Sequence, residues 1–416
     1  MINPLDNPAQ IAAEDEVIAL WRDERILAAR NHLGQLWRAG WGDSVPAEAE
    51  GDVDDFVDEY LTNWMFKAVA SDGRYPRFIR NFMPPHHWHG RDVPGARTGG
   101  DNPDNCYRLA GIEHGQAYRV TGRVLEREPV NVSFTLTGDY GTTVTIQTME
   151  NHQLERAADG SFVITIDDQP ANGRPNHMTT APHVKFLYIR DSMEDWAAET
   201  PFDLDIELVG SPDADPISRD EIVRRAVHRS REDVGLYHWF QTGFTLLTPN
   251  VLRPVDKARR TGGLVTQATA RAWWEIGEDD AVIIDYDPAG ANYVSIELSN
   301  FLFRSLDAGE RTSSLSRAQC AVSSDGRVRA VIAITDPGVA NWLDTSGFSK
   351  VMMMHRWQGL PSQPVNEGPH VRAKLVKIAD LRTELPADTV WFGAQQRAEQ
   401  IAARQAAFAR RYLING

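Results

Sequence analysis

The chain has 416 residues, of which 42% are hydrophobic and 24% are charged, and its formal net charge is −15. This length allows two or three domains, and the composition is that of a globular protein, not of a disordered or membrane-embedded one. The negative charge repels phosphate backbones, so we expect no nucleic-acid partner, although basic residues cluster at 224–231.

The first residues of the sequence and the number of cysteines indicate the cellular compartment in which the protein is expected. Residues 1–17 show no positive region followed by an apolar one, and no stretch approaches about 18 consecutive apolar residues. We therefore expect neither secretion nor a membrane partner. Cys106 and Cys320 are too few for a disulfide framework in a chain of this size. Together these observations predict a cytoplasmic protein.

The first 80 residues show helical periodicity. Apolar residues recur at helical spacing over 10–39, and Gly40 and Gly42 indicate where this pattern stops. A second helical pattern covers 53–69 and opens within an acidic segment. We predict a helical region over 1–80.

The period changes to two between 118 and 209. Val132, Phe134 and Leu136 alternate with polar residues, and 204–208 alternates in the same way. This pattern is typical of antiparallel strands with one face in water. We predict a first β-sandwich module over 81–212.

Turn-forming residues at 211–216 mark the end of this module. Ser218 and Glu221 then fit a capping box for a helix that runs to about 242, so we assign 213–261 to a connecting helix and linker. Strands are predicted at 281–286, 293–298, 327–335, 351–357 and 371–378, within a second sandwich over 262–385. A helix over 394–413, within 386–416, closes the chain. The predicted fold class is mainly β with α additions: two antiparallel β-sandwich or jelly-roll modules.

A weak internal repeat links the two β regions. The dipeptide Asp-Gly at 159–160 and again at 325–326 precedes a strand, and a long loop and a strand ending near Arg190 or Arg356 follow. Duplication of one topology and independent use of the same hairpin chemistry explain this pattern equally well.

Three histidines lie in the segment PPHHWHG at 84–90. A His-x-His pair places both rings on one face of a strand, which is how a jelly-roll metal site begins, but no Glu follows in register. We therefore expect no metal and no cofactor. Packing of the histidines on Trp88 and the prolines is one alternative; acid–base catalysis by His86, His87 or His89 is the other, because imidazole titrates near neutrality.

The polar segment 99–108 follows. Its Asn and Asp residues suit turns and need no substrate. Tyr107 and Arg108 can steady developing negative charge, and we add Asp104 to these catalytic candidates; Arg108 can instead pair with an internal Asp. Asn105 and Trp88 are candidates for substrate binding.

The second half contains DPGVANWLDTSG at 336–347. Asn341 can satisfy a loop backbone, Asp344 can cap a short helical turn and Trp342 can anchor the loop, all without a substrate. If the aromatic and charged residues around this loop converge, they form a cleft. The candidate substrate-binding residues here are Trp273, Trp274, Arg304, Asn341, Trp342, Asp344, His355 and Trp357.

Four segments carry a resemblance to a known family. They are DNPDNCYR at 101–108, DGSF at 159–162, YIRDSMEDW at 188–196 and DPGVANWLDTSG. The chain resembles the bacterial family called domain of unknown function 1214, whose named domain would cover about 262–378. The resemblance implies β-sandwich or jelly-roll modules but brings no settled activity and no catalytic residues. Cys106 departs from the apolar residue expected before Tyr107, which affects only packing.

The sequence leaves two functional hypotheses. Phosphate-loop, Rossmann, α/β-hydrolase, zincin and Cys-x-x-Cys motifs are all absent. We predict a cofactor-independent enzyme that uses acid–base chemistry, of lyase, hydratase, isomerase or hydrolase type, on a small hydrophobic or aromatic substrate in a Trp-lined cleft between the modules. The alternative is a non-catalytic protein that binds a carbohydrate or another hydrophobic ligand. A homo-oligomer is compatible with either hypothesis.

Overall fold

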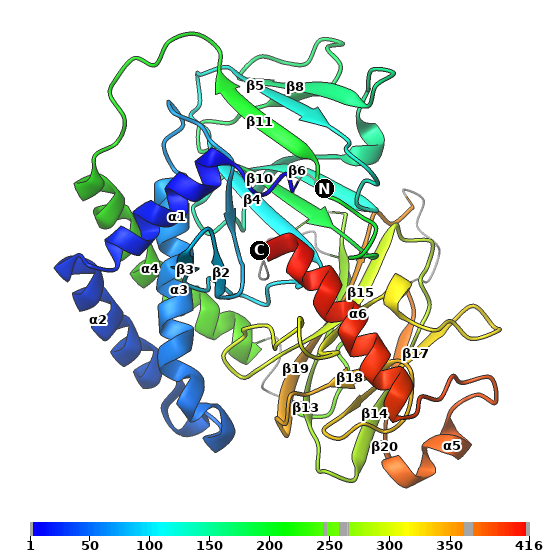
Figure 1. The fold of residues 1–416 in the computed structure, drawn as a ribbon. Helices are drawn as coiled ribbons and strands as arrows, with labels where there is room; N and C mark the ends of the chain where they lie inside the picture. Colours follow the sequence, from blue (N-terminus) through cyan, green and yellow to red (C-terminus); the bar gives the residue numbers. More distant parts are fainter. Residues whose placement is uncertain (1–2, 244–247, 258–263, 265, 362–368, 413–416) are drawn as a thin grey trace.

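The computed structural model describes residues 3–243, 248–257, 264, 266–361 and 369–412. It contains two β-sandwiches with helices packed against them (Figure 1), which confirms the predicted fold class. Within these residues, no helix is both long enough and apolar enough to cross a membrane. The expected boundary at 261/262 and the predicted helix end at 413 fall outside the described residues.

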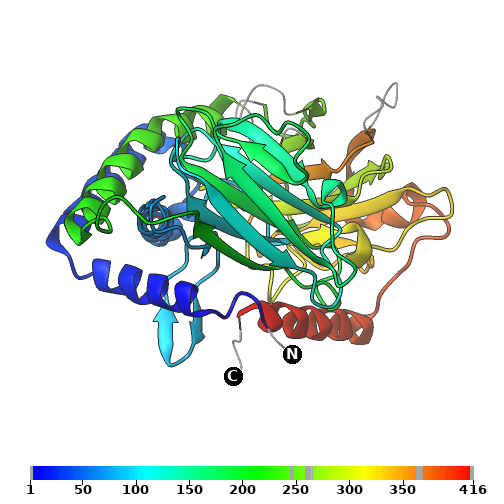
Figure 2. The same cartoon turned by 90° about the horizontal axis from the view of Figure 1, so that it is seen from above.

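Helices α1 to α4 form a layer on one side of the molecule (Figures 1 and 2). Their bounds are Pro8–Leu20, Glu24–Trp41, Val53–Val69 and Arg219–Gln241. The single helical stretch predicted over 10–39 is two helices, because Asp23 is an N-cap that accepts a hydrogen bond from Arg25 N and starts α2. Ser218 caps α4 as predicted. α3 is the central helix and is buried along most of its length.

The first sandwich pairs a five-stranded sheet, in the order β1-β4-β10-β6-β7, with a four-stranded sheet, β11-β5-β8-β9. Phe134, Ile164 and Ile189 fill the space between the sheets. The strands of the first sheet are Ile79–Asn81, Asn105–Gly111, Phe186–Ser192, Asn131–Thr137 and Thr145–Glu150, and those of the second are Asp203–Leu208, Tyr118–Arg123, Ser161–Asp167 and His177–Thr179.

The second sandwich has the sheets β12-β13-β19-β15-β16 and β18-β17-β14-β20. Trp274, Ile284 and Met353 lie in its core. The strands of the first sheet are Asp256–Lys257, Ala268–Glu275, Lys350–Gln358, Tyr293–Ser299 and Ser314–Ser316, and those of the second are Trp342–Asp344, Val328–Ala333, Asp280–Tyr286 and Val371–Lys377.

Smaller elements complete the fold. β2 (His86–Trp88) and β3 (Arg91–Val93) form a separate hairpin. The 3-10 turns are η1 to η3 (Gly42–Ser44, Ala47–Asp52 and Asn151–Gln153), η5 (Arg317–Gln319) and η6 (Ile378–Asp380). The short helix α5 (Leu381–Glu384) precedes α6 (Ala394–Tyr412), which runs along the second sandwich and ends near the N-terminus (Figure 2).

The two sandwiches have one topology. Taken in chain order, the strands of the second occupy the places of those of the first, and each contains one parallel pair, β8–β9 or β17–β18. A 3-10 turn closed by a capping box follows both β7 and β16. The repeated Asp-Gly hairpins therefore belong to equivalent strands of a duplicated arrangement.

The predicted water-exposed face occurs on the four-stranded sheet of the first module but not on its five-stranded sheet. β5 alternates buried and exposed residues, whereas every residue of β6 is buried, including Asn131, Ser133 and Thr135. The reason is that helices and the second sandwich cover the outer face of the five-stranded sheet. One apolar cluster joins Tyr188 of the first sandwich, Met354 of the second and most of α3.

Candidate functional site

A cavity of about 660 Å³ lies between the helices and the outer faces of the two five-stranded sheets. We call it the seam cavity. Aromatic and charged side chains from α3, α4 and both sandwiches line it, including Tyr60, Trp64, Lys67, Phe82, Asp101, Tyr107, Tyr188, Arg190, Asp233, Tyr237, Phe240, Arg271, Phe303 and Arg356.

Arg190 and Arg356 reach this cavity from matching strands. Arg190 lies on β10 opposite Ser133, and Arg356 lies on β19 opposite Ser295. Their neighbours Ile189 and Trp357 face the sandwich cores, so strand alternation turns both guanidinium groups outward to the seam. The duplicated topology thus places an arginine of each module at one cavity.

The two guanidinium groups differ in their partners. Arg356 Nη2 donates to Gly100 O at 2.6 Å, and its Nη1 pairs with the buried carboxylate of Glu297. Arg190 lies 4.3 Å above the Tyr188 ring, and its Nη1 is buried without a hydrogen bond to the described residues. Arg190 therefore has donor capacity left for a ligand.

Arg271 on β13 adds a third guanidinium group. It lies 5.3 Å from the Phe240 ring centre. Burial lowers the pKa of Arg271; the charge of Asp256 opposes this in part, and the charge of Arg356 lowers the pKa further. Burial likewise lowers the pKa of Arg356. Because like charges destabilise each other most where water is excluded, this wall of the cavity favours an anion.

Aromatic rings form the wall beside the arginines. Tyr107 and Tyr188 are stacked with ring centres 5.9 Å apart, and Phe82 lies 5.0 Å from Tyr107. The Tyr107 hydroxyl accepts a hydrogen bond from Asn102 N at 3.0 Å, and burial raises the pKa of Tyr107. A flat apolar group fits such a surface.

The backbone around the cavity contains unusual conformations. Phe82 and Phe303 have φ of 53° and 59°, which bulky residues rarely adopt. Gly100 has φ of 64°, and a Cβ atom there would lie 2.5 Å from the Phe303 ring. Conformations of this kind cluster at functional sites, where the surrounding packing holds them.

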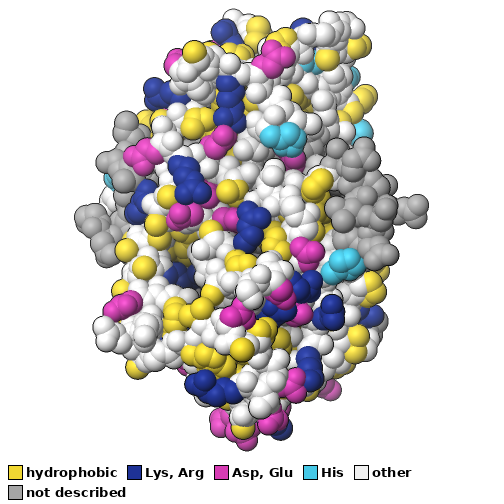
Figure 3. Space-filling model, turned by 90° about the vertical axis from the view of Figure 1, so that its right-hand side faces the viewer, with side chains coloured by type: hydrophobic (Ala, Val, Ile, Leu, Met, Phe, Trp, Pro, Cys, Tyr) yellow, Lys and Arg dark blue, Asp and Glu magenta, His cyan; other side chains and the backbone are white. Residues whose placement is uncertain are grey.

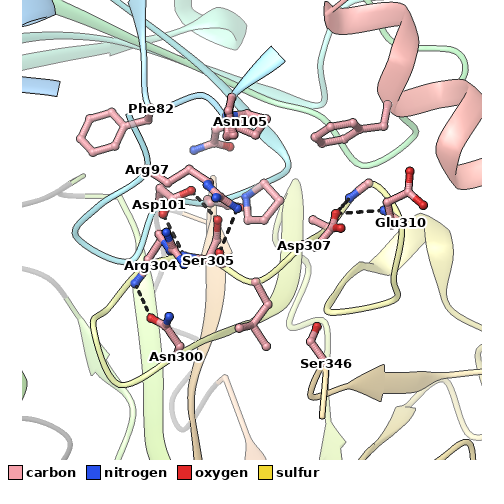
Figure 4. Close-up of a pocket in the computed structure, with 18 of the residues that line it drawn as sticks. Phe82, Arg97, Asp101, Asn105, Asn300, Arg304, Ser305, Asp307, Glu310 and Ser346 are labelled. Carbon is pink, nitrogen blue, oxygen red and sulfur yellow. Dashed lines mark hydrogen bonds between the residues drawn. The ribbon is translucent and has the colours of Figure 1, made fainter. Parts of the chain in front are cut away.

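A second, more polar cavity of about 680 Å³ adjoins the first (Figure 4). Phe82, Asp101 and Asn105 border both cavities. Glu59 lies between two guanidinium groups, accepting from Arg97 at 2.6 Å and from Arg304 at 3.1 Å. Arg97 and Arg304, which line this second cavity, are therefore already paired.

Asp101 is fixed where the two cavities meet. Its carboxylate accepts hydrogen bonds from Ser305 N at 3.1 Å and Ser305 Oγ at 2.6 Å, and burial raises its pKa. Figure 4 shows Asp101, Ser305, Arg97 and Arg304 close together, with Asp307 and Glu310 on the opposite side.

The three histidines singled out in the sequence lie outside both cavities. His86 is buried in the β2–β3 hairpin and bonds Pro84 O, and burial lowers its pKa to about 4. His87 pairs with Asp92 and His89 with Asp6, each at 2.8 Å on the surface. Their rings serve different partners, and among the described residues no group of three or more His, Cys, Asp or Glu side chains is placed to hold a metal ion.

Of the other candidate residues in the first half of the chain, some line the seam cavity and others have structural roles only. Tyr107 and Asn105 line the seam cavity. Arg108 instead donates to the buried Asp191 at 2.7 Å, the structural pairing that the sequence left open. Asp104 is buried between the modules and accepts from Trp196 Nε1 at 2.9 Å and Tyr293 OH at 2.6 Å. Trp88 is buried and donates to Glu14.

Most candidates of the second half are core residues. Trp274, His355 and Trp357 lie inside the second sandwich, where the His355 ring stacks 3.7 Å from Trp357 and burial lowers its pKa. Trp273 packs on Phe301 in the cluster beneath the helices. These side chains do not form the predicted Trp-lined cleft, because the alternation of side chains along each strand points them into buried hydrophobic clusters.

The DPGVANWLDTSG loop has the structural roles that its residues suggest. Asn341 bonds the backbone of Ala321 and Arg329, and Trp342 is buried and donates to Ala333 O. Asp344 ends the short strand β18 and pairs with Arg311, so the predicted helical cap is a strand end. Of the candidates in this half, Arg304 lines a cavity, the polar one. Pro84, Pro85 and Ser346, from the two loops singled out in the sequence, also border that polar cavity.

Sequence reasoning missed Lys67, Arg271 and Tyr188. It noted Arg190 without giving it a role, and it counted Arg356 among the charged residues around the loop at 336–347. One signal was available: each arginine interrupts a strand of mostly buried residues, as Arg356 does within Lys350–Gln358. A charge at such a position needs a partner or a ligand. The sequence does not show which face of the sheet carries it.

Comparison with known proteins supports the fold and assigns no activity. No family model and no curated protein matches the chain. Among solved structures, it is similar to an uncharacterised protein from Burkholderia cenocepacia, with 26% sequence identity and a TM-score of 0.70 over 86% of this chain and 96% of that chain. A protein from Vibrio parahaemolyticus aligns over 77% of this chain and 98% of that one, with 10% identity and a TM-score of 0.39.

Proposed function

We propose that the chain binds a small organic anion with an aromatic or apolar body in the seam cavity and performs acid–base chemistry on it. The observation that carries the proposal is the meeting of Arg190 and Arg356, from equivalent strands of the two sandwiches, beside stacked tyrosines. A guanidinium group matches a carboxylate with two parallel hydrogen bonds. The aromatic wall would hold the rest of the molecule.

Charge balance in the cavity supports an anionic ligand. Glu297 offsets the charge of Arg356, and Asp256 offsets part of the charge of Arg271, whereas Arg190 borders the same space without a carboxylate partner among the described residues. Burying a cation is costly unless an opposite charge compensates it. A bound carboxylate would supply that charge and complete the hydrogen bonding of Arg190.

The acid–base role falls to groups that border the cavity, since the histidines do not. Burial raises the pKa of Asp101 and of Asp233, so each carboxyl group holds its proton to a higher pH than an exposed one. A carboxyl group tuned in this way is suited to exchanging a proton with a substrate.

Binding without catalysis is the second candidate. The observation that favours it is that Asp101 and Tyr107 already bond Ser305 and Asn102, which leaves them less free to move a proton. Formation of a product from a bound ligand would exclude this alternative, and saturable binding without turnover would support it.

Calorimetric titration tests the proposed ligand class. We expect aryl carboxylates to bind more tightly than the matching neutral amides, and Arg190→Met to weaken carboxylate binding by about tenfold or more, because a charged hydrogen bond is lost. Arg119→Met is the matched control, since Arg119 pairs with Glu207 on the surface. Equal affinity for acid and amide, together with an unchanged Arg190→Met variant, would refute the proposal.

A cytoplasmic location and the resemblance to domain of unknown function 1214 remain predictions from the sequence. Cell fractionation with an antibody against the full chain would test the location.

A further inference from the structure

Lys67 is an unusual residue in this chain. Only six of the 43 Lys and Arg residues are lysines, and Lys67 lies on the central helix α3 with 4% of its surface exposed. Its ammonium nitrogen lies 4.4 Å from the Trp64 ring centre and 5.7 Å from that of Phe82. It forms no ion pair or hydrogen bond with the described residues, and it borders the seam cavity.

Burial favours the neutral form of Lys67. Burial lowers the pKa of Lys67, and the charges of Asp233 on α4 and of Asp139 in the loop between β6 and β7 oppose this only in part. Burial in turn raises the pKa of Asp233. An amine and a carboxyl group that are both shifted toward their uncharged forms therefore border one cavity.

A structural role alone accounts poorly for this arrangement. A cation above aromatic rings is also provided by arginine, which this chain uses at most of its basic positions. A buried ammonium group without a carboxylate within ion-pair distance is costly. Lysine differs from arginine in that it can lose its proton when buried, and the neutral amine is a nucleophile toward carbonyl carbon.

We propose that Lys67 forms an imine with an aromatic or apolar oxo acid held in the seam cavity, a proposal that rests on the function proposed above. The carboxylate of the oxo acid contacts Arg190 and Arg356, and its carbonyl carbon faces the Lys67 amine. The nitrogen of Lys67 forms a bond to that carbon, and the carbon–oxygen bond then breaks.

The step balances without a further reactant. The amine supplies two protons, and the carbonyl oxygen leaves with them as water. Asp233, which borders the same cavity and interacts electrostatically with Lys67, gives a proton to the departing oxygen and recovers one from the nitrogen through a water molecule. The resulting imine withdraws electrons from the adjacent carbon, which makes a proton or a carboxyl group there easier to remove.

Reductive trapping on the full chain tests the imine. The protein is incubated with phenylpyruvate as the probe, reduced with sodium cyanoborohydride, digested and analysed by peptide mass spectrometry. We expect the adduct on Lys67, in excess over the exposed Lys374 and Lys377 by on the order of tenfold at neutral pH, because a lower pKa exposes more neutral amine. The reaction at Lys67 should also reach its plateau at a lower pH than at Lys377, whose pKa is raised by the hydrogen bond to Asp280.

Controls separate the two proposals. Benzaldehyde, which lacks the carboxylate, should label Lys67 less than phenylpyruvate does, and Lys67→Arg should abolish the adduct while keeping a positive charge. The labelling pattern of the unaltered protein decides the question even if that variant fails to fold. If aryl carboxylates bind but phenylpyruvate labels only the exposed lysines, the imine is refuted and the binding function stands. If neither class binds, both proposals are refuted.

Discussion

At the scale of single residues, two arginines on neighbouring strands of the first sandwich differ in whether a carboxylate of the described residues pairs with them. Arg108 donates to Asp191 at 2.7 Å and to Phe202 O at 2.8 Å, both inside the first sandwich. Arg190, on the neighbouring strand, has Nη1 buried without a hydrogen bond to the described residues. The two arginines therefore differ in role although both occupy central strands.

This difference predicts opposite responses to the same substitution. Arg108→Met leaves Asp191 buried without its partner and should lower the free energy of unfolding by roughly 3 kcal/mol or more. Arg190→Met breaks no hydrogen bond or ion pair among the described residues, and methionine can keep a contact with the Tyr188 ring, so the free energy of unfolding should change by less than about 1 kcal/mol while ligand affinity falls. Urea unfolding of both variants measures the contrast; a large loss in Arg190→Met would show that Arg190 is structural.

Acid sensitivity follows from His86. Its pKa falls to about 4 in the folded chain because burial disfavours the charged ring, against 6.5 when exposed. The unfolded chain therefore binds the proton first, so stability is lost as the pH falls from 6.5 to about 4, by roughly 2 kcal/mol between pH 7 and pH 5.

Urea unfolding at these two pH values measures the loss. His86→Asn should be less stable at pH 7 but should lose less on acidification. The comparison isolates His86 because Glu14, whose pKa burial raises, titrates in both proteins. Parallel curves for the two proteins would contradict the assignment.

At the scale of elements, a Gly-Gly turn holds the cavity wall. Gly100 N donates to Phe303 O and Gly100 O accepts from Arg356, so the turn joins the first module to the second. Two features require glycine here: φ is 64°, and a Cβ atom would lie 2.5 Å from the Phe303 ring. The turn therefore fixes the distance between the loop that contains Gly100 and strand β19.

Alanine substitutions at Gly100 and Gly115 separate the cost of a positive φ from the cost of a clash with the Phe303 ring. Gly115 also has positive φ, 84°, but a Cβ atom at this position would meet no other atom within 4 Å, so Gly115→Ala tests backbone strain alone and should cost about 1 kcal/mol. Gly100→Ala adds a steric clash and should cost about 1–3 kcal/mol more, with weaker ligand binding. Urea unfolding and calorimetry measure both effects; equal losses would show that the close approach is unimportant.

Elements were predictable from the sequence where one periodicity applied throughout. The helix predicted over 53–69 is Val53–Val69, and the strand predicted over 293–298 is Tyr293–Ser299. The cavity was not predictable, because its wall uses alternate residues of strands that belong to two modules. Ser133 and Thr135 have the polar character of a water-exposed face, yet they are buried because helices and the second module cover the outer face of their sheet. Only the three-dimensional pairing of the modules reveals this.

At the scale of the whole molecule, duplication and packing create the site together. The two sandwiches meet through buried polar contacts, such as that of Asp104 with Tyr293 and that of Ser192 with Gln358, which lie 2.6 Å apart in each case. On the face shown in Figure 3, acidic and basic side chains are interspersed, so no single sign of charge dominates there. The concentrated positive charge lies inside, at the seam.

The most direct test is a crystal structure of the protein soaked with 4-bromobenzoate, in which anomalous scattering locates the bromine. We predict a peak in the seam cavity, with the carboxylate against Arg190 and Arg356 and the ring against Tyr107 and Tyr188. The same ligand should be absent from crystals of Arg190→Met. A peak confined to the polar cavity or the surface, or no peak at a concentration that saturates binding in solution, would contradict the central claim.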